Sequence, residues 1–88
     1  MGYLPLTELL AGLAEESSEL AQAALKLRRV FDKTNPTPVS EESAIAHLEE
    51  EIADVELYLD KIAYSKQNVK RIKTDKQARW DERLKREE

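Results

Sequence analysis

Cysteine is absent from this 88-residue sequence, and histidine occurs only once. Without cysteine the chain can have no disulfide framework, no thiolate chemistry and no cysteine-ligated zinc site. The single histidine, His47, excludes the paired Glu-x-x-His motifs of a ferritin-like di-iron centre. No Ser/His/Asp set or glycine-rich phosphate loop can be assembled either. Carboxylates are left as the main groups that could carry chemistry.

Long apolar runs are also missing. The sequence has no apolar stretch of about 18 residues, and its start does not combine a basic segment with an apolar one. We therefore expect no membrane span, no secretory signal and a cytoplasmic location. Only two Gly and three Pro occur, whereas 36% of the residues are charged and 41% are hydrophobic. This composition favours an all-α fold, and the length predicts a single domain over residues 1–88.

The net charge of −4 is unevenly distributed along the chain. Residues 1–65 contain 5 Lys/Arg against 13 Asp/Glu, net −8, whereas residues 66–88 contain 9 against 5, net +4. The basic tail raises the hypothesis of nucleic-acid binding. The negative charge of the whole chain and the alternating signs within the tail argue against it, so we expect no nucleic-acid partner.

The spacing of apolar residues predicts three helices, at about residues 7–32, 40–65 and 67–85. Thr7 is the expected N-cap of the first helix and Ser40 that of the second, because short hydroxyl side chains accept hydrogen bonds from the first free backbone N–H groups. The third helix is weakly amphipathic and basic.

The first two helices are joined by a short proline-containing loop, which predicts an antiparallel hairpin. A single hairpin buries too little apolar surface to be stable alone at this size. We therefore expect self-association to a dimer or tetramer with a four-helix-type core, to which the third, basic helix is added.

Each of the first two helices carries two carboxylates three residues apart. These four acids are Glu16, Glu19, Glu51 and Asp54. At about 100° per residue, Glu16 falls about 40° from Leu20, within the apolar stripe, and Glu19 falls about 100° from it, at the edge. Relative to Val55, Glu51 and Asp54 take the same two positions. Both helices should therefore direct an acidic pair at one shared core, formed by the following apolar residues: Leu9, Leu13, Leu20, Ala24, Leu27 and Phe31 in the first helix, and Ala44, Leu48, Val55, Leu59 and Ile62 in the second.

Such a group of carboxylates requires compensation. Two carboxylates about 4 Å apart repel each other by roughly 4 kcal/mol at an effective dielectric constant near 20, and an unpaired buried carboxylate protonates instead of remaining charged. Mg²⁺ binds carboxylate oxygens and keeps water or phosphate in its other positions. The sequence therefore predicts a Mg²⁺ site, with Mn²⁺ as a substitute ion.

The paired motif resembles the MazG-like all-α nucleoside triphosphate pyrophosphohydrolases. The similarity lies in Glu15-Glu16-x-x-Glu19-Leu20 and Glu50-Glu51-Ile52-Ala53-Asp54-Val55. It covers about residues 7–65 well and the tail loosely. The resemblance implies an oligomeric enzyme that binds Mg²⁺ through the four acids. This enzyme hydrolyses a nucleoside triphosphate (NTP or dNTP) between the α and β phosphates, giving the monophosphate and pyrophosphate. It also implies that Tyr58 faces the nucleotide and that four cations hold phosphates, namely Lys73, Lys76, Arg79 and Arg83.

Several positions have two interpretations. Gly12 either weakens the first helix or leaves room for a ligand. His47 is either a site residue or a surface or capping residue. Trp80 either stacks on a base or, as we favour, anchors a dimer contact. The cations of the third helix either face solvent or lie over the carboxylates.

The main alternative function is a non-catalytic module. In this interpretation the chain is a dimerising helical hairpin that mediates interactions, and its acids are paired by Lys and Arg from the tail. The position of the acids within the apolar stripes favours the metal site over this alternative.

Overall fold

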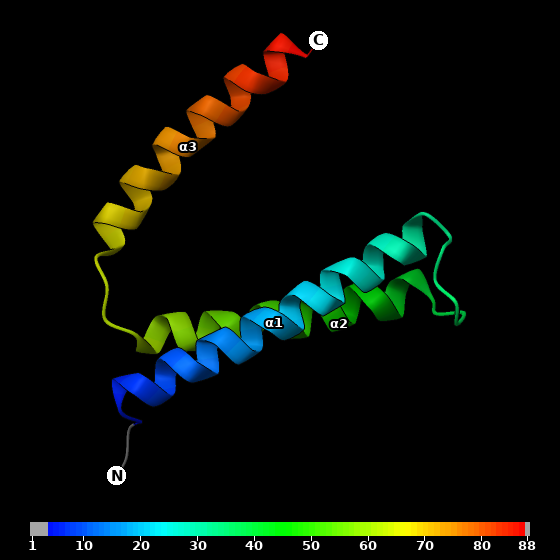
Figure 1. Cartoon of the computed structure of the whole chain (residues 1–88), viewed down its shortest axis with the longest axis horizontal. Helices are drawn as coiled ribbons and strands as arrows, with labels where there is room; N and C mark the ends of the chain where they lie inside the picture. Colours follow the sequence, from blue (N-terminus) through cyan, green and yellow to red (C-terminus); the bar gives the residue numbers. More distant parts are fainter. Residues whose placement is uncertain (1–3, 88) are drawn as a thin grey trace.

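A computed structural model describes residues 4–87, which form three α-helices and no strand. Helix α1 spans Leu6–Phe31, α2 spans Glu41–Lys61 and α3 spans Lys66–Arg86 (Figure 1). The predicted all-α fold class is confirmed. Within the described residues, no helix is both long and apolar enough to cross a membrane.

Serine caps begin two of the three helices. The Ser40 hydroxyl accepts a hydrogen bond from the Ser43 backbone N–H at 3.0 Å, and the Ser65 hydroxyl accepts one from Asn68 at 3.1 Å. The predicted cap at Ser40 is therefore confirmed. Helix α2 ends at Lys61, earlier than predicted, because the chain becomes extended at the next residue and stays out of helical geometry up to the second serine cap.

The ends of α1 differ from the prediction. Its N-cap is Pro5 and not Thr7, which lies inside the helix. Proline suits this place because its fixed φ is compatible with a helix start and it has no N–H group to leave unpaired. At the other end Lys33 adopts a left-handed φ of 63°, and the Thr34 N–H bonds to the Arg29 carbonyl at 2.9 Å. This Schellman-type ending turns the chain into the loop.

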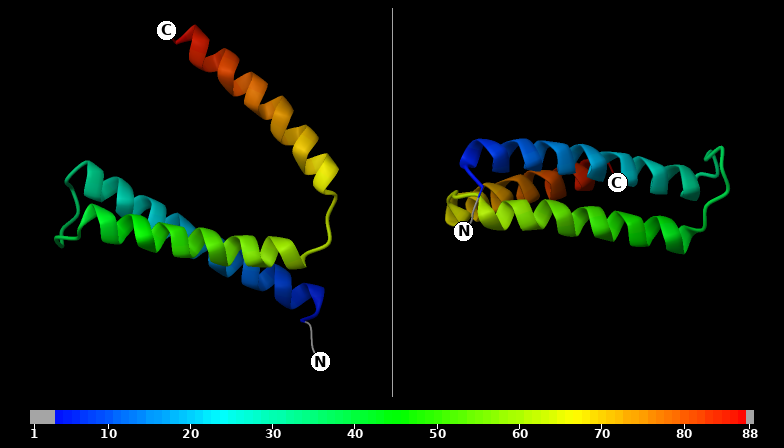
Figure 2. Two further views of the ribbon diagram at one scale, coloured as in Figure 1. Left: turned by 180° about the vertical axis from the view of Figure 1, so that it is seen from behind. Right: turned by 90° about the horizontal axis from the view of Figure 1, so that it is seen from below.

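Helices α1 and α2 pack side by side and antiparallel, as predicted (Figures 1 and 2). Helix α3 diverges from this hairpin after the short connection at residues 62–65, and within residues 4–87 it packs against neither α1 nor α2. The hairpin and the third helix are therefore separate parts of one chain.

The contact between α1 and α2 combines small residues with Leu9 and the ring of Tyr58. The buried apolar residues are Leu9, Ala23 and Ala44, with exposed fractions of 8%, 2% and 2%. A Cβ atom added at Gly12 would overlap the ring of Tyr58, so the glycine lets this ring lie against α1. Of the two interpretations of Gly12, room for a ligand gives way to room for an aromatic side chain.

This contact does not lie along the centre of the predicted stripes. Ala23 is rotated about 60° from Leu20, on the Glu16 side of α1, and in α2 the buried Ala44 and Glu51 are displaced from Val55 in the same sense. Small side chains let two helices approach closely, which explains why the contact runs along this side. Apart from Leu9, the leucines that were expected to fill the shared core lie beside the contact.

These displaced residues form a continuous apolar face. Because the two helices are antiparallel, residues rotated from the contact line by the same angle and in the same sense about each helix axis lie on the same side of the hairpin. The apolar face comprises Leu6, Leu10, Leu13, Leu20, Leu27 and Phe31 from α1, and Ile45, Leu48, Ile52, Val55 and Leu59 from α2. All of them are partly or largely exposed, up to 56% for Leu6 and 55% for Phe31. Two residues of the predicted core, Leu9 and Ala44, are buried in the contact, and most of the others lie on this open face.

Candidate metal centre

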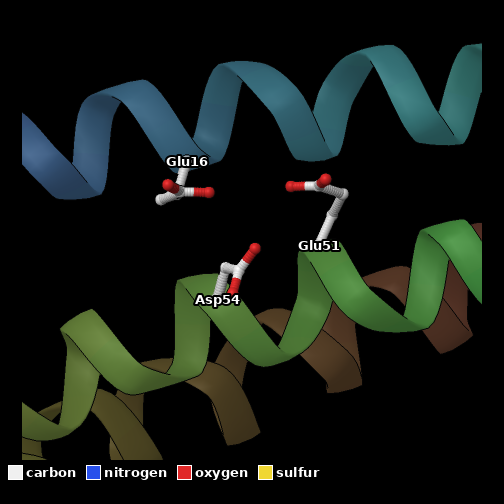
Figure 3. A group of neighbouring side chains, drawn as sticks. All are labelled: Glu16, Glu51 and Asp54. Atoms are coloured by element: carbon white, nitrogen blue, oxygen red, sulfur yellow. The ribbon is translucent and has the colours of Figure 1, made fainter.

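Three carboxylates from the two packed helices converge in the middle of the hairpin. Glu16 comes from α1, and Glu51 and Asp54 come from successive turns of α2 (Figure 3). One oxygen of each lies within 4.8 Å of one oxygen of each of the others. The hairpin contact thus brings Glu16 to two acids that lie 35 and 38 positions later in the sequence.

Glu51 is the buried member of this carboxylate cluster. Only 7% of the residue is exposed. Its Oε1 lies 3.3 Å from His47 Nε2, one turn earlier on α2, whereas its Oε2 is buried and finds no hydrogen-bond partner among residues 4–87. A buried oxygen without a partner is costly and rare. A cation between the three carboxylates would provide the missing partner.

The electrostatics of Glu16 reflect this crowding. Loss of hydration first, and then repulsion from Asp54, Glu19, Glu51 and Glu15, raise the pKa of the Glu16 carboxyl above its ordinary value. Within residues 4–87 no Lys or Arg forms an ion pair with any of the three clustered acids. The negative charge of the cluster is therefore uncompensated by cationic side chains of the same chain.

The fourth predicted ligand lies elsewhere. Glu19 is exposed and does not belong to the cluster. Together with Glu15, Glu50, Asp54 and His47 it lies on the side of the hairpin opposite the apolar face, which we term the acidic face. The acid cluster is thus at the base of this face, and Glu19 is at its surface.

The predicted substrate-binding residues fall into two groups. Tyr58 lies one turn after Asp54 on α2, with its ring against Gly12. The four cations, Lys73, Lys76, Arg79 and Arg83, all lie on α3 and are exposed. Because α3 does not pack on the hairpin, none of these cations lies over the cluster of its own chain. The interpretation in which they do so within one chain is wrong.

Sequence reasoning missed two contacts at this site. The first is the pairing of His47 with Glu51, for which the signal was their spacing of four residues on one helix. The second is the packing of Tyr58 on Gly12, for which the sequence carries no signal because the contact joins two helices.

Comparison of the chain with models of protein families, with curated proteins and with solved structures finds no match.

Proposed function

We propose that this protein is a Mg²⁺-dependent nucleoside triphosphate pyrophosphohydrolase that cleaves NTP or dNTP between the α and β phosphates. The observation that carries the proposal is the cluster of Glu16, Glu51 and Asp54, with one buried oxygen lacking a partner. The class of reaction follows from the resemblance of the two acidic motifs to MazG-like enzymes.

The residues of the cluster fit Mg²⁺. This ion prefers oxygen ligands, is bound through a few carboxylates and keeps other positions for water or substrate phosphates. Glu16, Glu51 and Asp54 supply carboxylate oxygens only. A soft or thiolate-preferring metal would find no suitable ligand here, since the chain has no cysteine. Mn²⁺ shares the preference for oxygen and is the expected substitute.

The chemistry of phosphoanhydride hydrolysis assigns roles to the side chains. When bound, the metal would neutralise phosphate oxygens and lower the pKa of a coordinated water. Glu16, Glu51 and Asp54 would hold it, and the contact with His47 holds the buried carboxylate of Glu51 in place. Tyr58 would face the nucleotide at the next turn. Cations of α3, including Lys73 and Arg79, would bind the pyrophosphate portion, since Lys and Arg pair strongly with phosphate.

Self-association belongs to the same proposal. The chain exposes 7519 Å² of surface, whereas a compact monomer of its mass, 10.1 kDa, exposes about 5,300 Å². The radius of gyration is 16.9 Å, against about 12 Å for a compact domain of this length. The excess, about 2,200 Å² per chain, is in the range that large homodimer interfaces bury. Stacking two apolar faces would create the four-helix core of a dimer, from which a tetramer could be built.

The test is an assay of pyrophosphate release. The protein is incubated with a panel of NTPs and dNTPs and Mg²⁺, and pyrophosphate is measured separately from phosphate. We expect release that EDTA abolishes and that falls by about 100-fold or more in Glu51→Gln and Asp54→Asn, because each removes a ligand of the metal. Glu56→Gln, an exposed acid of α2 outside the cluster, is the matched control and should keep activity.

A non-catalytic interaction module is the second candidate. It is favoured by the separation of the α3 cations from the acids within the chain and by the size of the open apolar face. No turnover of any nucleotide, together with no rise in melting temperature on adding Mg²⁺, would support this module. Activity that survives both cluster substitutions would instead show that the site is wrongly assigned.

A further inference from the structure

Helix α3 is amphipathic, and in the part of the chain that the structure describes it packs against neither of the other two helices. Every residue of Lys66–Arg86 is exposed, including four large apolar side chains: Val69 at 48%, Ile72 at 43%, Trp80 at 56% and Leu84 at 50%. Exposed apolar residues that no other helix covers mark a surface for interaction.

The stripe that contains these residues is basic as well as apolar. With Val69 as origin and about 100° per residue, Lys76, Trp80 and Arg83 lie within about 40° of it. A shallow hollow on the surface of α3 is lined by residues that include these last three. Residues 66–88 carry a net charge of +4, opposite to the −8 of residues 1–65. The stripe therefore suits a surface that is acidic and not one that is purely apolar.

The direction of α3 excludes the acidic face of its own hairpin as the surface that the stripe covers. In Figure 1, α1 runs from left to right in front of α2, so its contact line faces backward. The apolar residues are rotated from that line in the right-handed sense about α1, which turns the apolar face upward, toward the side on which α3 diverges. The view of Figure 3 agrees, since α3 passes behind the hairpin there. A second hairpin stacked on the apolar face would thus be placed between the first hairpin and its α3, with the acidic face of the second hairpin turned outward.

From these observations we propose that α3 of one copy packs across the acidic face of a second copy. It would bring Lys76 and Arg83 toward the partner's acid cluster, so that each metal centre is completed by cations from the other chain. This arrangement compensates charge that is unpaired within one chain, and it covers the stripe around Trp80. The proposal rests on the metal centre and the dimer that are proposed above. It further specifies that the phosphate-binding cations of each site come from the other copy.

Cross-linking between two single-cysteine variants tests the arrangement directly, because the chain has no cysteine of its own. Lys76→Cys places a thiol on the stripe of α3, and Glu15→Cys places one on the acidic face. The two variants, one with a size tag, are mixed, allowed to exchange and treated with a short bis-maleimide. We expect a cross-linked heterodimer. Ala78→Cys, on the opposite side of α3, is the matched control and should give little product.

The outcomes separate this proposal from the proposed function. Equal cross-linking from Ala78→Cys, or a dimer by light scattering without any product from Lys76→Cys, would overturn the trans arrangement while leaving the dimer intact. A chain that carries both Lys76→Cys and Glu15→Cys and cross-links within itself at high dilution would show that α3 folds back on its own hairpin, which also overturns it. None of these readouts depends on turnover of a nucleotide.

A mixed-subunit assay adds a functional readout. Asp54→Asn chains lack a cluster ligand, and Lys76→Glu/Arg83→Glu chains lack the cations of the stripe. In a trans arrangement, a mixed dimer has one intact site, so an equal mixture should regain about a quarter of the wild-type activity by random exchange. If each chain completes its own site, the mixture regains none, and the proposal fails. Recovery of activity supports the trans arrangement only if Lys76→Cys and Glu15→Cys also cross-link between chains.

Discussion

The acidic and apolar faces of the hairpin differ in how far the interactions of their side chains are completed within one chain. On the acidic side, three carboxylates meet within a single chain, and only their charge is left uncompensated. On the apolar side, eleven residues, among them Leu20 and Val55, remain partly or largely exposed within residues 4–87. The difference shows that the contact line of the helices runs near Ala23 and Ala44, which places the acids at the contact and leaves most of the large apolar side chains exposed.

Among the substitutions that test this difference between the faces, that of Leu20 should change the free energy of unfolding most. Leu20 lies at the centre of the apolar face, half-buried in one chain. If that face is the dimer core, Leu20→Ala should lower the free energy of unfolding by about 2–4 kcal/mol, because it leaves a cavity between the copies. Urea denaturation at several protein concentrations measures this change, and light scattering measures the dimer.

Leu25 provides the control for this prediction. It is also a leucine of α1, but it is 51% exposed and lies off the apolar face. Leu25→Ala should change the free energy of unfolding by less than about 0.5 kcal/mol. Equal losses at the two positions would mean that the apolar face has no partner.

Substitution of Gly12 tests the close packing of α1 on α2. Gly12→Ala should lower the free energy of unfolding by about 1–3 kcal/mol, because the new methyl group displaces the ring of Tyr58. In a Tyr58→Ala background the same change should stabilise the protein by up to about 1 kcal/mol, since alanine favours a helix more than glycine does. Thermal unfolding of the four proteins of this cycle measures the coupling. A destabilising effect of the same size in both backgrounds would contradict the contact.

The smallest expected effect concerns the charge of Glu16 in the metal-free protein. Its pKa is raised in the folded state, so the folded state binds more protons than the unfolded state in a pH window that begins near the ordinary glutamate pKa of about 4.3 and extends upward. Stability should therefore fall as pH rises through this window and stay lower above it. Glu16→Gln should remove that slope and raise the melting temperature at neutral pH.

Melting temperatures measured in EDTA across this pH range check the Glu16 prediction. Glu56→Gln is the control, because Glu56 is an exposed acid outside the cluster. The same slope in Glu16→Gln as in wild type would show that Glu16 is not the crowded carboxylate. Addition of Mg²⁺ should reverse the order at neutral pH, since the substitution removes a proposed ligand.

Much of the fold could be predicted from periodicity and caps. Ser40 marked the start of α2 because a serine before two glutamates satisfies the first N–H groups locally. The failure at Thr7 arose because Pro5 can begin a helix without any side-chain bond, which made a threonine cap unnecessary. The end of α2 was placed too late because nothing in the apolar spacing records the extended conformation of Ile62.

The site could be predicted in part for a similar reason. Spacing of three residues places Glu16 with Glu19 on one side of α1, but an arc of about 60° separates them, and the contact line decides which one is near α2. That line runs near Ala23 and Ala44, and Glu16 joins the cluster whereas Glu19 does not. Asp54 joins it from a position on α2 that corresponds to the position of Glu19 on α1, so rotation about the helix axis does not by itself decide which acids meet. The cations of α3 depend on the direction of a four-residue connection, which local pattern does not specify.

By itself, the sequence determined that the chain is helical, that its charges divide into an acidic body and a basic tail, and that two helices carry matching carboxylates. These properties depend on neighbours within a few residues, where propensity and periodicity operate. Only the tertiary structure decided which face of each helix meets the other, which three acids converge and where α3 points. Those choices depend on close approach between segments far apart in the chain, and they are set by the small side chains that allow it.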